Sequence, residues 1–196
     1  MRTEQISVYK FNELSDEAKE TAIERFKELD YEWWDAAYED FKTIGTLMGI
    51  DIDNIYFSHM YCQGSGACFE GTYSYKKGSV KALKEYAPQD ETLHGIVEGL
   101  YSVQRKAFYS LEAKVKQRGH YNHANCTDID VTDNRLDYYE AASQDNEEAI
   151  SEFLRDFMNW MMKRLYAEYE YLTSEEAIIE TINCNDYEFD EDGNLY

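Results

Sequence analysis

The chain has 196 residues, of which 40 are Asp or Glu and 19 are Lys or Arg, so its formal net charge is −21 at pH 7. Its apolar content of 43%, with 15% aromatic residues, is enough for a folded core and excludes a disordered acidic tail. A surface of this charge is repelled by the phosphates of nucleic acids and of anionic lipids. Direct binding to nucleic acid or to a membrane is therefore not expected.

The first residues and the cysteines indicate the cellular compartment of the protein. The N-terminus lacks the apolar run of a secretory signal, and the longest apolar run, residues 157–162, is far shorter than the ~20 residues that cross a bilayer. The cysteines form no CxxC pair, so we expect reduced thiols. They are Cys62, Cys68, Cys126 and Cys184. The sequence predicts a cytoplasmic protein.

The first quarter of the chain predicts a short strand followed by two amphipathic helices. Residues 6–9 alternate as in a strand, and Ser15 is a suitable N-cap for the first helix because acidic residues follow it, where the helix dipole favours them. Apolar residues then recur every three or four positions. They are Ala18, Ala22, Phe26 and Leu29 in the first helix, and Trp34, Ala37, Phe41, Ile44 and Met48 in the second. Gly49 is expected to end the second helix.

The middle of the chain predicts two β-hairpins with a helix between them. The first hairpin has aromatic-rich strands, and the second has strands in which apolar and polar residues alternate. The expected ranges are 55–62 and 67–75 around a turn at 63–66, then 93–103 for the helix, then 109–116 and 121–131 around a turn at 118–119.

The last third predicts a long helix over 144–172, a second helix that begins at a capping box at 173–176, and a final strand and turn in 187–196. The apolar stripe of the long helix consists of Ile150, Phe153, Leu154, Phe157, Met161 and Leu165. Strands and helices do not alternate as in parallel α/β proteins, so the expected fold class is α+β, with antiparallel hairpins forming a sheet packed against several amphipathic helices. Because Pro88 is the single proline and no linker-like stretch occurs, residues 1–196 are expected to form one compact domain.

Charge is distributed unevenly along the chain. Residues 11–41 contain 11 acids and 3 bases, residues 76–118 contain 5 acids and 9 bases, and residues 128–196 contain 20 acids and 4 bases. A basic middle is therefore flanked by two acidic segments.

The long helix organises part of this acidic charge into one stripe. At 100° per residue, Asp145, Glu148, Glu152 and Asp156 lie on one face, opposite the apolar stripe. Acids four residues apart are about 6 Å apart along the axis, a spacing of the same order as that of phosphates along a DNA strand. These four residues are the predicted partner-binding site. We expect them to occupy a cationic groove of another protein that ordinarily binds nucleic acid. The alternative is an ordinary solvated face, because like charges at this spacing cost only a few tenths of a kcal/mol each.

Two histidines and a cysteine are the candidate metal ligands. His120, His123 and Cys126 are donor types that zinc accepts. No second cluster lies nearby in the sequence, although His59, Cys62 or Cys68 could approach in space. In an extended strand, however, residues three apart point to opposite faces. We therefore predict no metal and no cofactor, with these three residues as weak candidates.

Three other motifs are better explained by structural roles than by ligand binding or catalysis. The glycine-rich stretch 63–66 precedes a strand rather than a helix, so it predicts a hairpin turn and not a phosphate-binding loop. The acids of 188–193 resemble the start of a calcium loop, but no twelfth-position glutamate follows. Cys68 in an aromatic strand is typical of a core residue rather than a nucleophile. We therefore predict that the protein is not an enzyme.

Several stretches of the chain resemble a family of phage and prophage proteins, described as uncharacterised or as a phage-derived "antitoxin of toxin–antitoxin stability system". These stretches are 9–19, 31–34, 50–57, 64–71, 169–174 and 187–193. The most particular is the central Gly-Ala-Cys-Phe-Glu-Gly stretch at 66–71. The resemblance implies a protein of mobile-element origin that acts in the cytoplasm of a bacterial host cell, and it carries no catalytic residues.

Three functions follow as hypotheses. The first is a non-enzymatic inhibitor that binds a host defence or nucleic-acid-processing protein through its carboxylates, in the manner of a nucleic-acid mimic. The second is an antitoxin that neutralises a cognate toxin with a basic surface. The third, of another class, is a metal-dependent enzyme that uses His120, His123 and Cys126.

Overall fold

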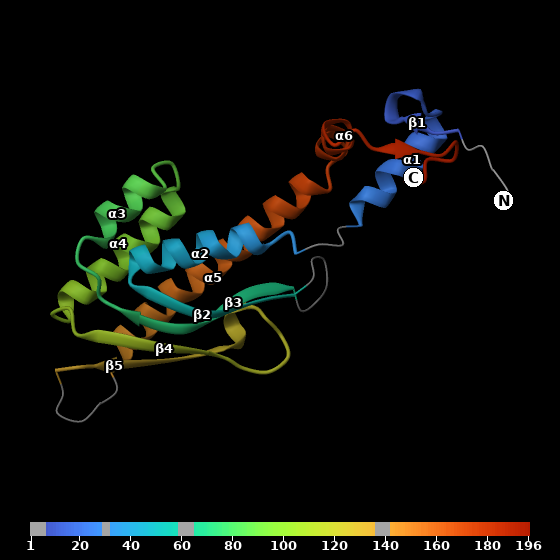
Figure 1. Ribbon diagram of the computed structural model, residues 1–196. Coiled ribbons are helices and arrows are strands. Elements are labelled where there is room, and N and C mark those ends of the chain that lie inside the picture. Colours follow the sequence, from blue (N-terminus) through green and yellow to red (C-terminus); the bar gives the residue numbers. More distant parts are fainter. Residues whose placement is uncertain (1–6, 29–31, 59–64, 136–141) are drawn as a thin grey trace, which may run out of the picture. The chain divides into compact units, whose positions relative to one another are not determined.

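A computed structural model describes residues 7–28, 32–58, 65–135 and 142–196. The chain divides into two compact units, Met1–Trp34 with Ala167–Tyr196, here called the terminal unit, and Asp35–Tyr166, here called the central unit. In the described residues a two-stranded sheet and a four-stranded sheet, both antiparallel, occur together with six α-helices (Figure 1). The fold is α+β, as the sequence predicts. The single domain stays a prediction.

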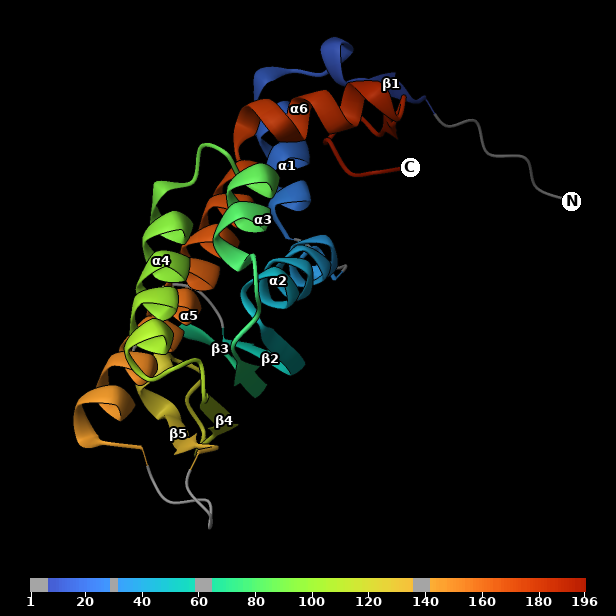
Figure 2. The same ribbon diagram turned by 90° about the vertical axis from the view of Figure 1, so that its left-hand side faces the viewer.

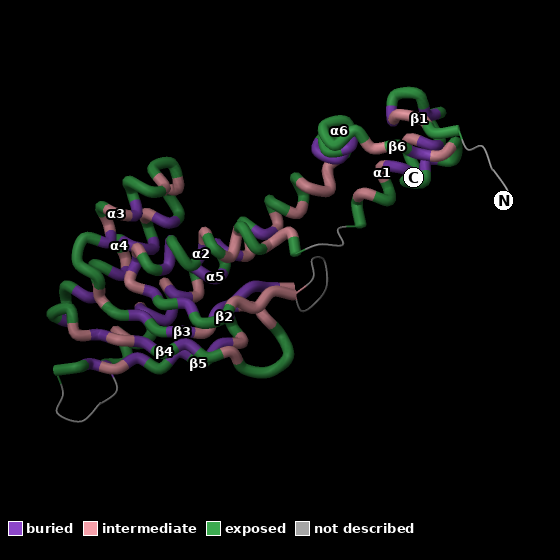
Figure 3. Tube along the Cα trace, in the orientation of Figure 1, coloured by how far each residue is buried: buried purple, intermediate pink, exposed green. Residues whose placement is uncertain are grey.

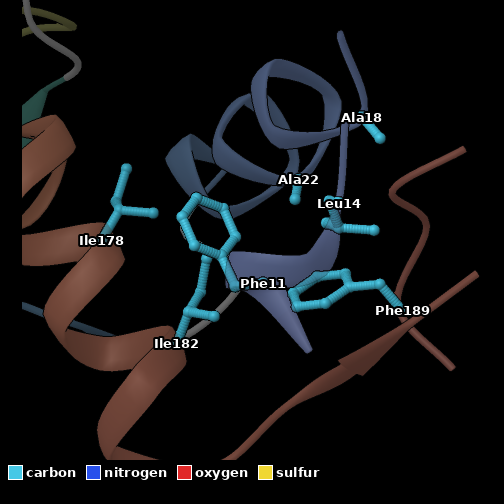
Figure 4. Close-up of a cluster of buried hydrophobic side chains, with 7 residues drawn as sticks. All are labelled: Phe11, Leu14, Ala18, Ala22, Ile178, Ile182 and Phe189. Atoms are coloured by element: carbon cyan, nitrogen blue, oxygen red, sulfur yellow. The ribbon is translucent and has the colours of Figure 1, made fainter. Parts of the chain in front are cut away.

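The terminal unit is built from the two ends of the chain. It contains β1 (Tyr9–Lys10), the 3₁₀ turn η1 (Phe11–Glu13), α1 (Asp16–Lys27), α6 (Glu175–Cys184) and β6 (Glu188–Phe189). Strands β1 and β6 pair antiparallel, with Tyr9 opposite Phe189. Figure 4 shows the buried side chains that join these elements, namely Phe11, Leu14, Ala18, Ala22, Ile178, Ile182 and Phe189. The two ends of the chain therefore share one core.

Local polar contacts set the boundaries in this unit. The hydroxyl of Ser15 accepts a hydrogen bond from Ala18 N at 3.2 Å, so the predicted N-cap is confirmed. The cap of α6 is Ser174, one residue after the start of the predicted capping box. The strand predicted at 6–9 is wrong in its bounds: β1 begins at Tyr9, and it ends after two residues because the Glu13 carboxylate accepts from Lys10 N at 2.8 Å and closes a turn.

The central unit is a four-stranded sheet with helices. Its elements are α2 (Asp35–Met48), β2 (Ile50–Ser58), β3 (Gly66–Ser74), α3 (Ser79–Tyr86), α4 (Glu91–Lys106), β4 (Leu111–Gln117), η2 (Ala124–Cys126), β5 (Thr127–Asp133) and most of α5 (Gln144–Leu172). The strand order is β2-β3-β4-β5, and each neighbouring pair is antiparallel. Both predicted hairpin pairings are confirmed, and α3 and α4 form the connection between them.

The helices cover one face of this sheet. Buried and exposed residues alternate in β5 and at the start of β2, where Ile129 and Val131 and Ile50 and Ile52 are buried and the residues between them are exposed (Figure 3). Residues 66–69 of β3 are instead all buried. The exposed positions carry mostly charged and hydroxyl side chains. They include Asp51, Asp53, Thr72, Lys114, Lys116, Asp128 and Asp130. This alternation is what an antiparallel sheet with one solvated face requires.

Helix α5 packs its apolar stripe on the sheet and on two other helices. The ring of Phe157 lies 6.0 Å from that of Phe69 on β3, and the ring of Trp160 lies 5.6 Å from that of Phe41 on α2. Helix α4 runs beside α5 (Figure 2), where a Cβ at Gly99 would overlap the ring of Phe153. The predicted bounds of the long helix, 144–172, are confirmed.

Asp90 ties the start of α4 to α5. One oxygen of its carboxylate accepts from Leu93 N at 3.0 Å, which caps α4, and the other accepts from the indole Nε1 of Trp160 at 2.8 Å. A single side chain thus both begins one helix and fixes its neighbour.

The structure departs most from the sequence prediction at three places in the central unit, namely two strand boundaries and one helix. Strand β2 begins at Ile50 rather than at 55, and the eight-residue helix α3 is not predicted at all. Strand β5 begins at Thr127 rather than at 121, because the connection 118–126 packs on β3 instead of pairing with β4: a Cβ at Gly66 would overlap the backbone of His123. Ile6, Leu29, His59, Cys62 and the first half of the turn 63–66 lie outside the described residues.

None of the helices in the described residues combines the length and the apolar character that crossing a bilayer requires.

Two glycines of the central unit should respond to alanine with opposite signs. Gly49 ends α2 at φ +92°, and a Cβ there would overlap the carbonyl oxygen of Ser74. Gly49→Ala should lower the free energy of unfolding by about 2 kcal/mol. Gly95 lies inside α4, and a Cβ added there would meet open space. Gly95→Ala should therefore raise the free energy of unfolding by about 0.5–1 kcal/mol. Urea unfolding of both variants checks this, and equal effects would contradict the role assigned to Gly49.

Candidate functional site

The acidic stripe of α5 is exposed along its whole length. Asp145, Glu148, Glu152 and Asp156 are each exposed to solvent. The opposite side of the helix is buried without solvent contact at Ile150, Leu154, Phe157, Met161 and Leu165. The helix therefore cannot rotate about its axis without exposing its apolar stripe, which keeps the four carboxylates directed at solvent.

These four carboxylates are not neutralised by neighbouring cations. Within residues 7–28, 32–58, 65–135 and 142–196, none of them lies within 4 Å of a Lys, Arg or His nitrogen. Glu148 accepts a hydrogen bond from the side-chain amide of Gln144 at 2.9 Å, which leaves its charge in place. The exposed Lys163 follows Asp156 by seven residues, two turns along the same face, so the stripe is bounded at its C-terminal end.

The candidate metal ligands come together only in part. His123 Nε2 lies 3.5 Å from the sulfur of Cys126, because the 3₁₀ turn η2 replaces the extended strand predicted there. His120 is exposed in the connection before this turn. In the part of the chain that the structure describes, no group of three His, Cys, Asp or Glu side chains is arranged to hold a metal ion. Among the described residues the contact is thus a pair of side chains, and His59 and Cys62, which were considered as further ligands, lie outside those residues.

Two other motifs have structural roles. Strand β3 begins at Gly66, one residue earlier than predicted and inside the turn predicted at 63–66, and residues 63 and 64 lie outside the described residues. In the terminal unit, the Asp190 carboxylate accepts hydrogen bonds from the backbone N–H and side-chain amide of Asn194 and from Asp192 N. These bonds, with the Asn194 side chain the largest cause, lower the pKa of Asp190. Its oxygens close the final turn.

Cys68 is a buried thiol. Its exposed fraction is 0%, and burial raises its pKa to about 12, to which the nearby Cys126 contributes. Within the described residues Cys68, Cys126 and Cys184 are free of disulfides. A thiol that stays protonated at neutral pH is a poor nucleophile, in agreement with the core role predicted for it.

The structure contains a groove that the sequence analysis missed. It has a volume of about 1160 Å³ and lies between α3, α4 and the segments that follow β3 and α4. Its walls include Tyr75, Tyr101 and Tyr109, and Lys77, Lys81 and Lys84. The basic composition of 76–118 is the feature of this groove that the sequence shows. The sequence does not show that the three tyrosines come together.

A family comparison now bears on these features. The model of the family DUF8835, a domain of unknown function, matches residues 33–175. The chain belongs to this family. No curated protein and no solved structure was found to match it.

The DUF8835 match contains the whole central unit, from Asp35 to Tyr166. Both the acidic stripe of α5 and the tyrosine groove therefore lie in the part of the chain that defines the family. Most of the terminal unit lies on either side of the match.

Thiol reactivity provides a direct check on the environment of Cys68. Iodoacetamide should modify the exposed Cys184 rapidly at pH 7.5, whereas Cys68 should react only after the protein is unfolded in urea. Peptide mapping by mass spectrometry measures both sites in one sample, so Cys184 is the internal control. Equal rates at the two residues in the folded protein would contradict the buried, protonated thiol.

Proposed function

We propose that this protein is a phage-encoded inhibitor that acts without catalysis, by placing the acidic stripe of α5 in a cationic groove of a host defence or nucleic-acid-processing protein. The observation that carries the proposal is the row of four exposed carboxylates on one face of a helix whose other face is buried. Within the described residues, none of the four forms an ion pair within 4 Å. The resemblance to phage and prophage proteins supports the cellular setting.

The geometry of the stripe fits a surface that ordinarily binds nucleic acid. Carboxylates four residues apart on a helix repeat at about 6 Å, on the order of the phosphate spacing along one DNA strand. Because α5 is fixed by its core contacts, the spacing is set before binding, and little backbone entropy is lost when a partner docks.

No ion pair among the described residues compensates the charge of the stripe. Glu148 and Glu152 are four residues apart, as are Glu152 and Asp156, and each like-charged pair destabilises a helix by a few tenths of a kcal/mol. The cations of a partner would relieve the repulsion between these carboxylates and would be attracted to them. Charge complementarity of this kind acts mainly on the rate of association and on specificity, and it weakens with salt.

The decisive variant neutralises the stripe by Asp145→Asn, Glu148→Gln, Glu152→Gln and Asp156→Asn. Its matched control neutralises four exposed acids on the solvated face of the sheet, by Asn replacement of Asp51, Asp53, Asp128 and Asp130. Both variants have the same net charge, so they separate the position of the charge from its amount.

Immobilised wild-type protein should capture its partner from a bacterial host lysate, and capture should fall as salt rises from 50 to 300 mM. The stripe variant should lose at least about 90% of the captured partner, the order expected when several charge pairs are removed, whereas the sheet control should retain most of it. A partner retained equally by the stripe variant, with unchanged salt dependence, would contradict the proposal and direct attention to the acids of 11–41 or to Trp33 and Trp34. A small toxin as the captured protein would favour the antitoxin hypothesis.

The protein itself should not bind duplex DNA. At 150 mM salt the net charge of −21 opposes the phosphates, so a gel-shift titration of a thirty-base-pair duplex should show no retardation. Clear retardation would mean that the basic residues of 76–118 dominate the interaction with nucleic acid.

A further inference from the structure

The tyrosine groove of the central unit combines flat aromatic faces with cationic side chains. Tyr75 follows β3, Tyr101 lies on α4 and Tyr109 follows α4, and the three meet along one wall. Lys77 lies in the turn before α3, and Lys81 and Lys84 lie on the exposed side of α3. A hollow of about 1160 Å³ is large enough for a molecule of the size of a mononucleotide.

The three rings form an accessible aromatic platform. Tyr75 and Tyr109 have ring centroids 4.4 Å apart, and Tyr101 lies 6.2 Å from Tyr109 and 6.5 Å from Tyr75. Tyr101 and Tyr109 keep 37% and 40% of their surface exposed. The side-chain interaction with Tyr101 is the main cause that raises the pKa of Tyr109. Such a platform offers π-faces to a planar ligand.

The backbone at the rim of the groove adopts a costly conformation. Phe108 and Tyr109 have φ values of +55° and +63°, in the left-handed region that bulky residues rarely occupy. Buried Gln104 holds this turn, because its amide donates to Leu111 O at 2.7 Å and its carbonyl accepts from Leu111 N at 3.2 Å. The conformation places Tyr109 on Tyr75, and strain of this kind is concentrated at functional positions in proteins.

The lysines differ in their partners. Lys84 pairs with Glu98 at 2.5 Å, and Lys81 lies 3.6 Å from Glu85 in an exposed position. Within the described residues, Lys77 has no carboxylate within 4 Å. The groove lining, which also includes Glu85 and Glu98, therefore contains one ammonium group without an ion pair among the described residues and a second one that is only weakly engaged.

We propose that this groove binds a free nucleoside monophosphate, with its base stacked on the tyrosine platform and its phosphate held by Lys77 and Lys81. A planar base matches the aromatic wall, and a compact dianion matches the two ammonium groups. The strongly acidic surface elsewhere opposes a long polyanion, which favours a free nucleotide over a strand. This site is separate from the acidic stripe of α5 and does not depend on its proposed role.

Isothermal titration with adenosine 5′-monophosphate at 150 mM salt tests the proposal. Wild type should bind one equivalent, and Lys77→Ala and Tyr109→Asn should each weaken binding about tenfold, the order expected for a lost charged hydrogen bond or a lost base stack. The matched controls are Lys114→Ala on the solvated face of the sheet and Tyr121→Ala before η2, both exposed and outside the groove. These controls should bind as wild type does.

Tyr109→Asn also separates a binding role from a structural one. Asparagine tolerates the left-handed region better than tyrosine, so this variant should be at least as stable to urea as wild type while it loses the ligand. The stripe variant of α5 should bind the nucleotide with wild-type affinity, so a failure of either proposal is distinguishable from a failure of the other.

Adenosine and inorganic phosphate, titrated separately, should each bind more weakly than the nucleotide, because each engages one half of the groove. Absence of heat with millimolar nucleotide, or unchanged affinity in both groove variants, would overturn the proposal. Tighter binding of a ten-nucleotide adenine strand than of the monophosphate would overturn the assignment to a free nucleotide.

Discussion

The contact of α5 with the four-stranded sheet is the interaction on which the central unit depends. Phe157 packs on Phe69 of β3, Trp160 packs on Phe41 of α2, and Gly99 of α4 leaves room for Phe153. Truncating a buried aromatic residue such as Phe157 to alanine costs about 3–5 kcal/mol, a large part of the stability of a domain of this size. The same contact determines which side of α5 faces solvent. The packing of the core therefore also determines that the four carboxylates of α5 are exposed.

This arrangement gives the central unit two surfaces of different chemistry. The acidic stripe presents carboxylates that form no ion pair with the described residues, whereas the tyrosine groove presents aromatic faces and lysines. Helix α4 contributes to both: it packs against α5 through Gly99, and it supplies Tyr101 and the strained turn that places Tyr109. Both surfaces lie in the DUF8835 match, which identifies this unit as the part of the chain in which to seek the function of the family.

Features that depend on local periodicity could be predicted from the sequence. The bounds of α5, the cap at Ser15 and the stop at Gly49 all follow from patterns within one or two helical turns. The exposure of the four acids of α5 follows in the same way, because the helical angle alone places them opposite Phe157. Helix α3 was missed because it is short and its N-cap is Gly78, which supplies no capping side chain.

Features that depend on contacts between distant segments could not be predicted. The connection 118–126 leaves the second hairpin because it packs on β3 at Gly66, and no local pattern records that contact. The tyrosine groove assembles residues 75, 101 and 109 from one helix and two connecting segments. The left-handed turn at Phe108 is held by Gln104 from inside the core. A pattern of one or two turns contains none of this information.

The central claim is that the acidic stripe of α5 is the surface that a protein partner covers. Carboxyl footprinting tests it most directly: the free protein and the captured complex are treated with a carbodiimide and glycine ethyl ester, and labelling is measured at each Asp and Glu by mass spectrometry. The account predicts that Asp145, Glu148, Glu152 and Asp156 are labelled in the free protein and protected in the complex, while Asp51 and Asp128 on the sheet remain labelled in both. Full labelling of the four α5 carboxylates in the complex would contradict it.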